Sequence, residues 1–380
     1  MVFYTYVGYA IVLYLLVRLR RIFKGKRIEP PLSQFFPSLT LIVAAYNEEN
    51  IIEEKIENTI NLRYQTDKLR IVFITDGSSD RTPDIIARHD EIDLMHSPQR
   101  SGKIAAIHRA MKDVDSEIVV YTDANTFLNA DALLYIARHY ADPTVGAVSG
   151  EKRVLQDAVS DATAGEGFYW KYESTLKKWD SELYSVVGAA GELFSVRRSL
   201  YTDVESDTIL DDFMISMLIA LKGYRIIYEP AAYASELSSD NIKEELKRKI
   251  RIAAGGIQSI LRLKPLLNPF QNSLLSFQYI SHRVLRWTVT PFLMILTFIL
   301  NMAICAESDN VIYWLILIGQ VLFYSMALGG WLLEKRKIKV KLLFVPYYFC
   351  IMNYAVLAGI LRYINGSQSA IWEKAKRKSA

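Results

Sequence analysis

Four long apolar stretches constrain the fold of this chain more than any other feature of its sequence. They cover about 2–17, 285–306, 311–333 and 342–361. Each reaches or approaches the roughly 20 residues that an α-helix needs to cross the hydrocarbon core of a bilayer. A single stretch of this kind could be a buried core helix, but three in succession after a charged region favour membrane-spanning segments. The mean hydropathy of +0.12 over 380 residues agrees. We therefore expect an integral membrane protein with about four transmembrane helices.

The charges between these stretches predict their orientation. Basic residues follow the first stretch at 18–27 and separate the third from the fourth at 335–341, whereas 306–310 has no Lys or Arg. By the positive-inside rule, the middle of the chain is cytoplasmic and the short loop at 306–310 lies outside. No basic residue precedes the first stretch, so we expect an uncleaved anchor and not a signal peptide. If all four segments span, the basic tail "WEKAKRKSA" lies outside against the rule, which leaves a re-entrant fourth segment open.

Bulk charge and cysteine content argue against two classes of site. The net charge is only +4 at pH 7, so bulk charge does not indicate nucleic-acid binding. Cys305 and Cys350 both lie in apolar stretches. They therefore predict neither a disulfide framework nor a cysteine metal site.

Between about 38 and 235, apolar runs typical of strands alternate with segments of helical periodicity. The runs "SLTLIVAAYN", "LRIVFITDGSSD" and "EIVVYTD" are interleaved with "EENIIEEKIENTINL", "SGKIAAIHRAMKDV" and "NADALLYIARHY". This order predicts an α/β domain with a mostly parallel sheet, in which ligands bind beyond the carboxyl ends of the strands. The polar residues expected at those ends are Tyr46, Asn47, Glu48, Asp76, Asp123 and Asn125.

A nucleotide at this edge of the sheet would need a device that holds its phosphates. The first loop, "AAYNEENI", has no glycine, so it is not a dinucleotide-binding turn, and the chain has no P-loop. A divalent cation is the obvious alternative, because Mg²⁺ commonly bridges carboxylates and substrate phosphates. Asp123 and Asn125 alternate along an extended segment and can point to the same side. They are the candidate ligands, and the uncharged amide predicts a weaker site than two carboxylates would form.

The segment 241–263, "NIKEELKRKIRIAAGGIQSILRL", has one apolar and one basic face. This pattern is typical of a helix in the headgroup region of a membrane. The following "LKPLLNPFQNSLLSFQYISHRVLRW" could hold a second interfacial helix.

Six motifs, in order, resemble those of one family. They are "VAAYNEEN", "TDGSSDRT", "GKIAAI", "TDAN", "GAAGELFSVRRSLY" and "ILDDFMISMLIALKGYRIIYEP". The chain resembles membrane-embedded family 2 glycosyltransferases, the inverting GT-A kind that includes cellulose, chitin, hyaluronan and poly-N-acetylglucosamine synthases. The resemblance implies a Rossmann-like GT-A domain on the cytoplasmic side of a bacterial-type inner (plasma) membrane, a UDP-sugar donor and a divalent metal, Mg²⁺ or Mn²⁺.

The resemblance also implies roles for individual residues. Asp212 matches the catalytic base, and Asp211 stands at the preceding acidic position of the motif. A simpler alternative is that one of them caps the helix that follows. The implied substrate-binding residues are Ala44, Tyr46, Glu48 and Asp76 around the uridine, Lys103 and Asp123 at the donor phosphates, Gly191 in the acceptor-side loop, and Arg248 and Arg251; the implied metal ligands are Asp123 and Asn125.

One motif departs from the pattern of the family. Synthases of this family carry Gln-x-x-Arg-Trp, whereas this chain has "RKIRI", with Arg248 in place of Gln and Ile252 in place of Trp. A second Arg could hold a diphosphate by paired hydrogen bonds, and the missing Trp leaves a lipid-linked or nonpolymeric acceptor open. The aromatic residues Trp170, Tyr172 and Trp179 could stack on acceptor sugars or could equally be core or membrane-interface anchors.

We therefore expect inverting transfer from a UDP-sugar to a glycan acceptor, with polysaccharide synthesis and export. The alternatives are transfer of one sugar to a lipid acceptor, or a non-catalytic membrane subunit that binds nucleotide or glycan. The expected organisation is an anchor at 1–20, a GT-A domain at 36–236, interfacial helices at 240–283, three transmembrane segments at 284–363 and a basic tail at 364–380.

Overall fold

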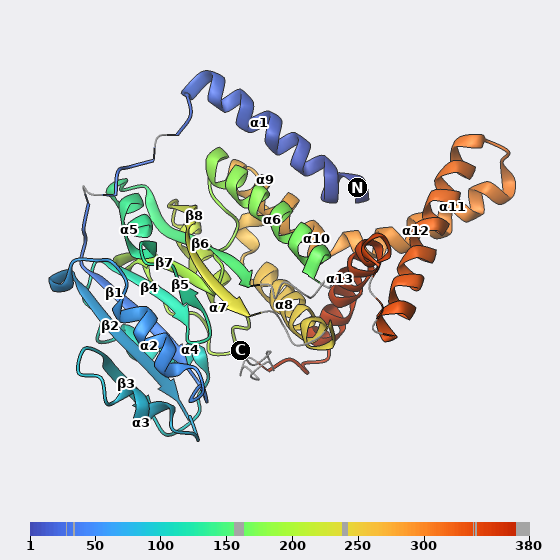
Figure 1. Ribbon diagram of the computed structural model, residues 1–380. Helices are drawn as coiled ribbons and strands as arrows, with labels where there is room; N and C mark the ends of the chain where they lie inside the picture. Colours follow the sequence, from blue (N-terminus) through green and yellow to red (C-terminus); the bar gives the residue numbers. More distant parts are fainter. Residues whose placement is uncertain are drawn as a thin grey trace.

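The central element is a single eight-stranded sheet (Figure 1). The computed structural model describes residues 1–27, 29–32, 35–155, 163–237, 242–336, 338 and 340–369. The order of the strands in the sheet is β3-β2-β1-β4-β7-β6-β8-β5. Their bounds are β1 Leu39–Ala45, β2 Leu69–Asp76, β3 Asp93–Ser97, β4 Ile118–Asp123, β5 Phe127–Leu128, β6 Val145–Leu155, β7 Leu193–Arg197 and β8 Arg225–Leu237.

The pairing of the strands is mostly parallel, as the sequence predicts. Strands β3, β2, β1 and β4 pair in parallel, and so do β6 and β8. Strand β7 is antiparallel to both of its neighbours, and β5 is antiparallel to β8. Register pairs Ala44 with Ile74 on one side and with Asp123 on the other, so the ends of β1, β2 and β4 meet at one edge.

Alternating side chains of the strands feed two hydrophobic cores, one on each face of the sheet. Leu41 and Val43 belong to one core and Ile42 to the other. The helices of this domain are α2 Ile52–Ile60, α3 Thr82–Ile86, α4 Lys103–Met111, α5 Ala132–Ala137, α6 Thr163–Leu183 and α7 Asp211–Leu221. Buried residues of α2, α3 and α5 join the first core, whereas those of α4 and α7 join the second. The sheet is therefore covered on both faces, and ligands have access at its edge.

The N-terminal segment packs against α6 (Figure 1). It begins with a π-helical turn, η1 (Tyr4–Gly8), and continues as α1 (Tyr9–Lys24). Tyr9, Leu13 and Val17 are buried against Leu176 of α6. The described part of the chain holds three helices that are long and apolar enough to cross a membrane, and α1, with 16 residues, is not among them. Three of the about four expected spans are thus matched by such helices, and the anchor at 1–20 stays a prediction.

Three helices near the C-terminus have the length and composition of membrane spans. They are α11 (Val289–Glu307), α12 (Val311–Lys335) and α13 (Lys341–Ile364). Helices α11 and α12 extend away from the sheet, whereas α13 lies against α8 (Ile242–Arg262) (Figure 1). Helix α13 is continuous through Pro346, so it is not a re-entrant loop. The basic tail lies outside the described residues from 370 onward.

Helix α8 is enclosed by protein instead of lying free on a surface. A Cβ at Gly255 would lie 2.6 Å from Leu210, and one at Gly256 would lie 2.6 Å from the Trp287 ring. A Cβ at Gly359 of α13 would lie 2.6 Å from Ala253 of α8. Neighbouring side chains and α13 therefore pack closely on several sides of α8, because glycine leaves room there. Helix α8 thus joins the sheet domain to α13, and its predicted place in the headgroup region stays a prediction.

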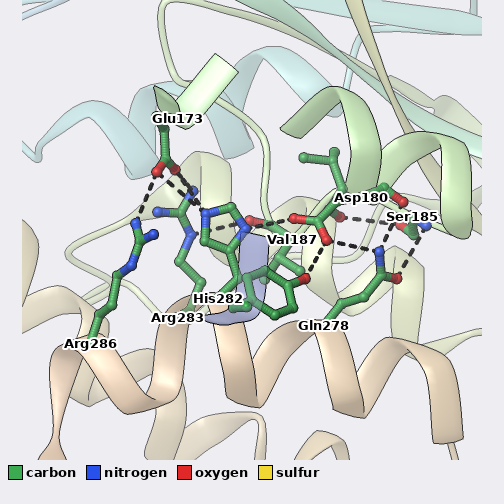
Figure 2. Close-up of polar contacts among 10 residues, drawn as sticks. Glu173, Asp180, Ser185, Val187, Gln278, His282, Arg283 and Arg286 are labelled. Carbon is green, nitrogen blue, oxygen red and sulfur yellow. Dashed lines mark hydrogen bonds and ion pairs between the residues drawn. The ribbon is translucent and has the colours of Figure 1, made fainter. Parts of the chain in front are cut away.

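A buried network of charged side chains joins α6 to the helical segment that follows α8 (Figure 2). That segment comprises η5 (Lys264–Leu267), α9 (Ser273–Tyr279), the π-helical turn η6 (Ile280–Val284) and α10 (Leu285–Trp287). The His282 ring contacts Asp180 at 2.6 Å and Glu173 at 3.3 Å. Glu173 also pairs with Arg283 at 2.7 Å and Arg286 at 3.0 Å. Removal of one partner from such a buried pair typically lowers the free energy of unfolding by about 3–5 kcal/mol. The network therefore favours this one packing arrangement of the helices.

Candidate active site

A cleft with an empty volume of about 600 Å³ opens at the carboxyl ends of β1, β2 and β4. Arg100, Gly102 and Ala106 line its side formed by α4 and the preceding loop. The predicted site residues that line the same cleft are Ala44, Tyr46, Glu48, Asp76, Lys103, Asp123 and Asn125. The structure thus brings together seven residues from four segments that are far apart in the sequence: the ends of β1, β2 and β4 and the start of α4.

The end of the cleft at β2 is organised by one carboxylate and one stacked pair. Asp76 accepts hydrogen bonds from the backbone N–H groups of Ser101, at 2.7 Å, and Gly102, at 2.6 Å. The Arg100 guanidinium lies over the Tyr46 ring, 3.8 Å from its centroid, and donates to the Tyr46 hydroxyl at 2.7 Å. Arg100 was not predicted, and its position just before the Gly-Lys pair of "GKIAAI" is the only signal that could have identified it.

Lys103 connects this cleft to the acidic turn of α7. Its ammonium donates to Asp123 Oδ1 at 2.7 Å and lies 3.6 Å from Asp211 Oδ2. Burial opposes its charge, but Asp123 and Asp211 outweigh burial and raise the pKa of Lys103. Lys103 is therefore a fixed positive charge between the cleft and α7.

Asp212 lies beside this lysine in the first turn of α7. Burial and the neighbouring Asp211 carboxylate raise the pKa of Asp212 to about 7, against the opposing charge of Lys103. A Cβ at Gly191 would lie 3.1 Å from Asp212 Oδ2, so the acceptor-side loop passes directly over the carboxylate. Such a carboxyl group can exchange a proton near neutral pH, which is what a general base requires.

The structure does not support the simpler alternative of a capping role for these two acids. The N-cap residue of α7 is Leu210, so neither acid occupies the capping position. Both acids lie inside the first turn, where the helix dipole favours negative charge.

The two arginines of "RKIRI" are placed differently. Arg251 donates to the Ile209 carbonyl at 3.2 Å and is close enough to the acidic turn for Asp211, Asp212 and Asp123 to favour its charge. Arg248 instead pairs with Glu245 at 2.9 Å and lies 3.8 Å from Glu236.

Arg248 is not among the residues that line the cleft, whereas its ionic neighbours reach the acceptor-side loop. Lys152 pairs with Glu192 at 2.6 Å and contacts Glu236. Glu192 directly follows Gly191. This buried network, defined by Lys152, Glu192, Glu236, Glu245 and Arg248, supports the loop over Asp212, and sequence reasoning did not identify it.

The donor set at the cleft partly fits a divalent cation. Asn125 Oδ1 and Asp211 Oδ2 are buried oxygens without a hydrogen-bond donor among the residues that the structure describes. Asp123 adds a carboxylate at the end of β4. In the described ranges, no group of three or more His, Cys, Asp or Glu residues is placed to hold a metal ion by itself. Asp123 and Asn125 could therefore hold a cation only together with substrate oxygens.

A buried lysine beneath the cleft also escaped prediction. Lys55 of α2 is fully buried and donates to the Thr126 carbonyl at 2.6 Å. Burial lowers the pKa of Lys55 to about 7, although Asp123 opposes this shift. A lysine at helical spacing from Ile52 and next to Ile56, on an apolar helix face, is the signal that could have identified it.

The three aromatic candidates lie in different surroundings. Trp179 packs on Tyr14 of α1, with ring centroids 5.3 Å apart, and Tyr172 donates to the Tyr6 carbonyl at 2.7 Å. These two serve the contact between α6 and the N-terminal segment. The Trp170 ring lies 5.4 Å from the Lys152 ammonium and 5.3 Å from that of Lys249, next to the buried network.

Comparison with known proteins agrees with this architecture. Residues 40–204 match the family model described as glycosyl transferase family 2. The chain is 30% identical over 234 residues to the poly-beta-1,6-N-acetyl-D-glucosamine synthase of Staphylococcus aureus strain MSSA476, with 59% of this chain and 56% of that protein covered. The Staphylococcus epidermidis protein of the same name is 26% identical over 231 residues. The chain thus spans about half the length of the curated relatives that it matches.

A solved structure resembles the whole chain. It is the mannosyltransferase PcManGT from Pyrobaculum calidifontis in complex with GDP-Man and Mn²⁺. The TM-score is 0.72 at 24% identity, with 97% of this chain and 98% of that chain covered. The match supports the fold along nearly the whole chain. The sequence, the sheet and the arrangement of the site agree with these comparisons: residues 40–204 match the glycosyl transferase family 2 model, and the fold is of the GT-A type.

Proposed function

We propose that the chain transfers a sugar, with inversion, from a UDP-sugar to a glycan acceptor at the cytoplasmic face of a bacterial-type inner membrane, in polysaccharide synthesis and export. The observation that carries the proposal is the sharing of Lys103 between Asp123, in the cleft, and Asp211, beside Asp212. Homology to poly-N-acetylglucosamine synthases supports a polysaccharide product. The three apolar helices support a membrane location.

The residues of the site can divide the chemistry between them. Asp212 accepts the proton of the attacking acceptor hydroxyl, and its raised pKa makes it a stronger base than an ordinary aspartate. Lys103 lies where it can bind the leaving diphosphate, whose negative charge grows as the sugar departs. Attack from the face opposite the diphosphate inverts the anomeric centre.

A divalent cation would be held by Asp123 and Asn125 together with donor phosphates. It would supply further positive charge to the leaving diphosphate, which can be worth several kcal/mol. Support comes from Asn125 Oδ1, a buried oxygen that accepts no hydrogen bond from any residue that the structure describes, and from the Mn²⁺ in the complex of the mannosyltransferase.

A donor screen tests the proposal. Detergent-purified protein would be given UDP-sugars and GDP-mannose in turn, with Mg²⁺ or Mn²⁺, and release of nucleoside diphosphate would be measured. We expect release from at least one UDP-sugar. Release from GDP-mannose alone would reject the UDP assignment but keep the transferase. No release with any donor would support the non-catalytic alternative.

Transfer of a single sugar to a lipid acceptor is the second candidate. Ile252, at the Trp position of the family motif, and the placement of Arg248 away from the cleft favour it. Gel analysis after feeding radiolabelled donor separates the two candidates, because a polymerase gives a ladder of long products and a single transfer gives one lipid-soluble product.

A further inference from the structure

A second cavity lies between the sheet domain and the C-terminal helices. Its empty volume is about 1570 Å³. Its walls come from η1 and α1, from α6, from α8, from the end of η6 with α10, and from α13. Tyr6 connects the N-terminal segment to two other walls of the cavity. Its hydroxyl donates to Asn353 of α13, and its carbonyl accepts from Tyr172 of α6.

The lining of this cavity suits a hydrocarbon chain better than a sugar chain. It is mostly apolar, with Val7, Ile11, Ile252, Met352 and Val356 among its residues. A glycan there would leave many hydroxyl groups without partners, which is costly in an apolar environment. The hydrocarbon chain of a lipid would instead meet a surface as apolar as the bilayer interior that it leaves, so it would lose no hydrogen bonds on entering.

The charged part of the lining is exclusively basic among the described residues. Lys249, Arg283 and Arg286 line the cavity, and no Asp or Glu does. Glu173 pairs with both arginines, as Figure 2 shows, and Glu245 lies 3.5 Å from Lys249 while it also binds Arg248. Neither carboxylate lines the cavity, so the charged groups that would face an occupant are the three cations.

The cavity adjoins the catalytic helix through one aromatic ring. Trp287 lines the cavity, and its ring centroid lies 5.4 Å from that of Phe213, the residue after Asp212. Helix α8 likewise lines the cavity with Ile252 while the adjacent Arg251 lies near the acidic turn. An occupant of the cavity would thus lie one layer of side chains from the turn that carries Asp212.

We propose that this cavity binds one membrane lipid, with its hydrocarbon chain along α13 and α1 and its phosphate headgroup at Lys249, Arg283 and Arg286. The site accepts an anionic phospholipid in preference to a zwitterionic one. The inference is independent of the donor sugar and of the reaction, because lipid binding can be measured without either.

Native mass spectrometry of the full chain tests the proposal. Protein relipidated from micelles with equal amounts of phosphatidylglycerol and phosphatidylcholine would be released from detergent, and the lipid retained per chain would be counted. We expect one retained phosphatidylglycerol. Lys249→Gln should weaken this retention about tenfold, because it removes one charged hydrogen-bond donor from the headgroup site. Val356→Trp should abolish retention by filling the cavity.

Matched variants control for charge and bulk. Lys247→Gln removes the same charge from an exposed position on α8, and Leu322→Trp adds the same ring to an exposed position on α12. Neither residue lines the cavity, so both variants should retain lipid like the wild type. Val7→Trp fills the cavity from the N-terminal segment, so the test remains decisive if Val356→Trp fails to fold.

Three results would overturn the proposal. The first is equal retention of both lipids by the wild type. The second is unchanged retention in Lys249→Gln and in the folded tryptophan variants. The third is retention of an added β-linked N-acetylglucosamine oligosaccharide that displaces the lipid and is lost in Val356→Trp, because this would identify a glycan site.

Discussion

At the scale of single residues, the site is a balance of charges around Lys103. The Lys103 ammonium contacts the Asp123 and Asp211 carboxylates. The negative charge of Asp211 raises the pKa of Asp212, and the positive charge of Lys103 opposes this shift. Two carboxylates in adjacent positions resist simultaneous ionisation, so one of them keeps its proton to a higher pH. In the structure the pKa of Asp212 is raised, by burial and by the Asp211 carboxylate.

Asp212→Asn should reduce turnover by roughly 10²–10⁴-fold, the usual contribution of a general base. The donor KM should change little, because Asp212 does not line the donor cleft. Steady-state kinetics of nucleoside diphosphate release would measure both. Asp67→Asn, at an exposed position, is the matched control. Turnover like that of the wild type in Asp212→Asn would reject the assignment.

The pH profile should follow the same carboxyl group. Asp212 must be unprotonated to act as a base, so kcat/KM should rise with pH through about 7 and level off above it. Asp211→Asn removes a negative charge that raises the pKa of Asp212, so the rise should move to lower pH. An unchanged midpoint in Asp211→Asn would contradict this coupling.

Asn125→Asp should increase the affinity of the site for the divalent metal. A second carboxylate next to Asp123 adds charge to the ligand set, so half-maximal activity should need less Mg²⁺ or Mn²⁺. Titration of activity with metal after chelation would measure this. Asn310→Asp provides a control, since the Asn310 side chain accepts from the Ile312 N–H, as a carboxylate also can, and does not line the cleft. Full activity in excess chelator would contradict metal dependence.

At the scale of elements, the acceptor-side loop and α7 form one unit. Gly191 passes over Asp212, and the following Glu192 is held by Lys152 in the buried network with Arg248. The sequence places Arg248 in a motif that binds substrate in the family, whereas its contacts in the structure are to the network that supports this loop.

Gly191→Ala should lower kcat by roughly tenfold, because the new Cβ would lie 3.1 Å from Asp212 Oδ2 and displace the carboxylate by a few tenths of an ångström. The donor KM should stay close to the wild-type value. Gly319→Ala, where no atom lies within 4 Å of the added carbon, is the control. A kcat equal to that of the wild type would contradict this prediction, because it would show that the loop can shift and leave the Asp212 carboxylate in place.

At the scale of the whole molecule, α8 joins the GT-A domain to the membrane helices. Glycines at three contacts let α8 approach the segment before α7, the Trp287 ring and α13. The buried network of Figure 2 adds a second connection, from α6 to the helices before the spans. The turn that carries Asp212 is therefore held by helices that also pack against the long apolar helices α11 and α13.

The topology of the spans can be tested with single cysteines. In a Cys305→Ala, Cys350→Ala background, Asp309→Cys should react with a membrane-impermeant maleimide on intact cells, because the loop between α11 and α12 lacks basic residues. Arg336→Cys, between α12 and α13, should react only after permeabilisation. The reverse pattern would place the sheet domain outside and would contradict the proposed function.

By itself, the sequence determined the α/β class, the mostly parallel sheet and the edge where Ala44, Asp76 and Asp123 meet. It also identified the three apolar spans, because periodicity and apolar length are local properties of the chain. Only the tertiary structure decided that Lys103 bridges Asp123 and Asp211, that Lys55 is buried beneath the cleft, and that Arg248 supports a loop. These arrangements depend on contacts between residues far apart in the sequence, and the burial and neighbouring charges that shift their pKa values exist only once the elements have packed together.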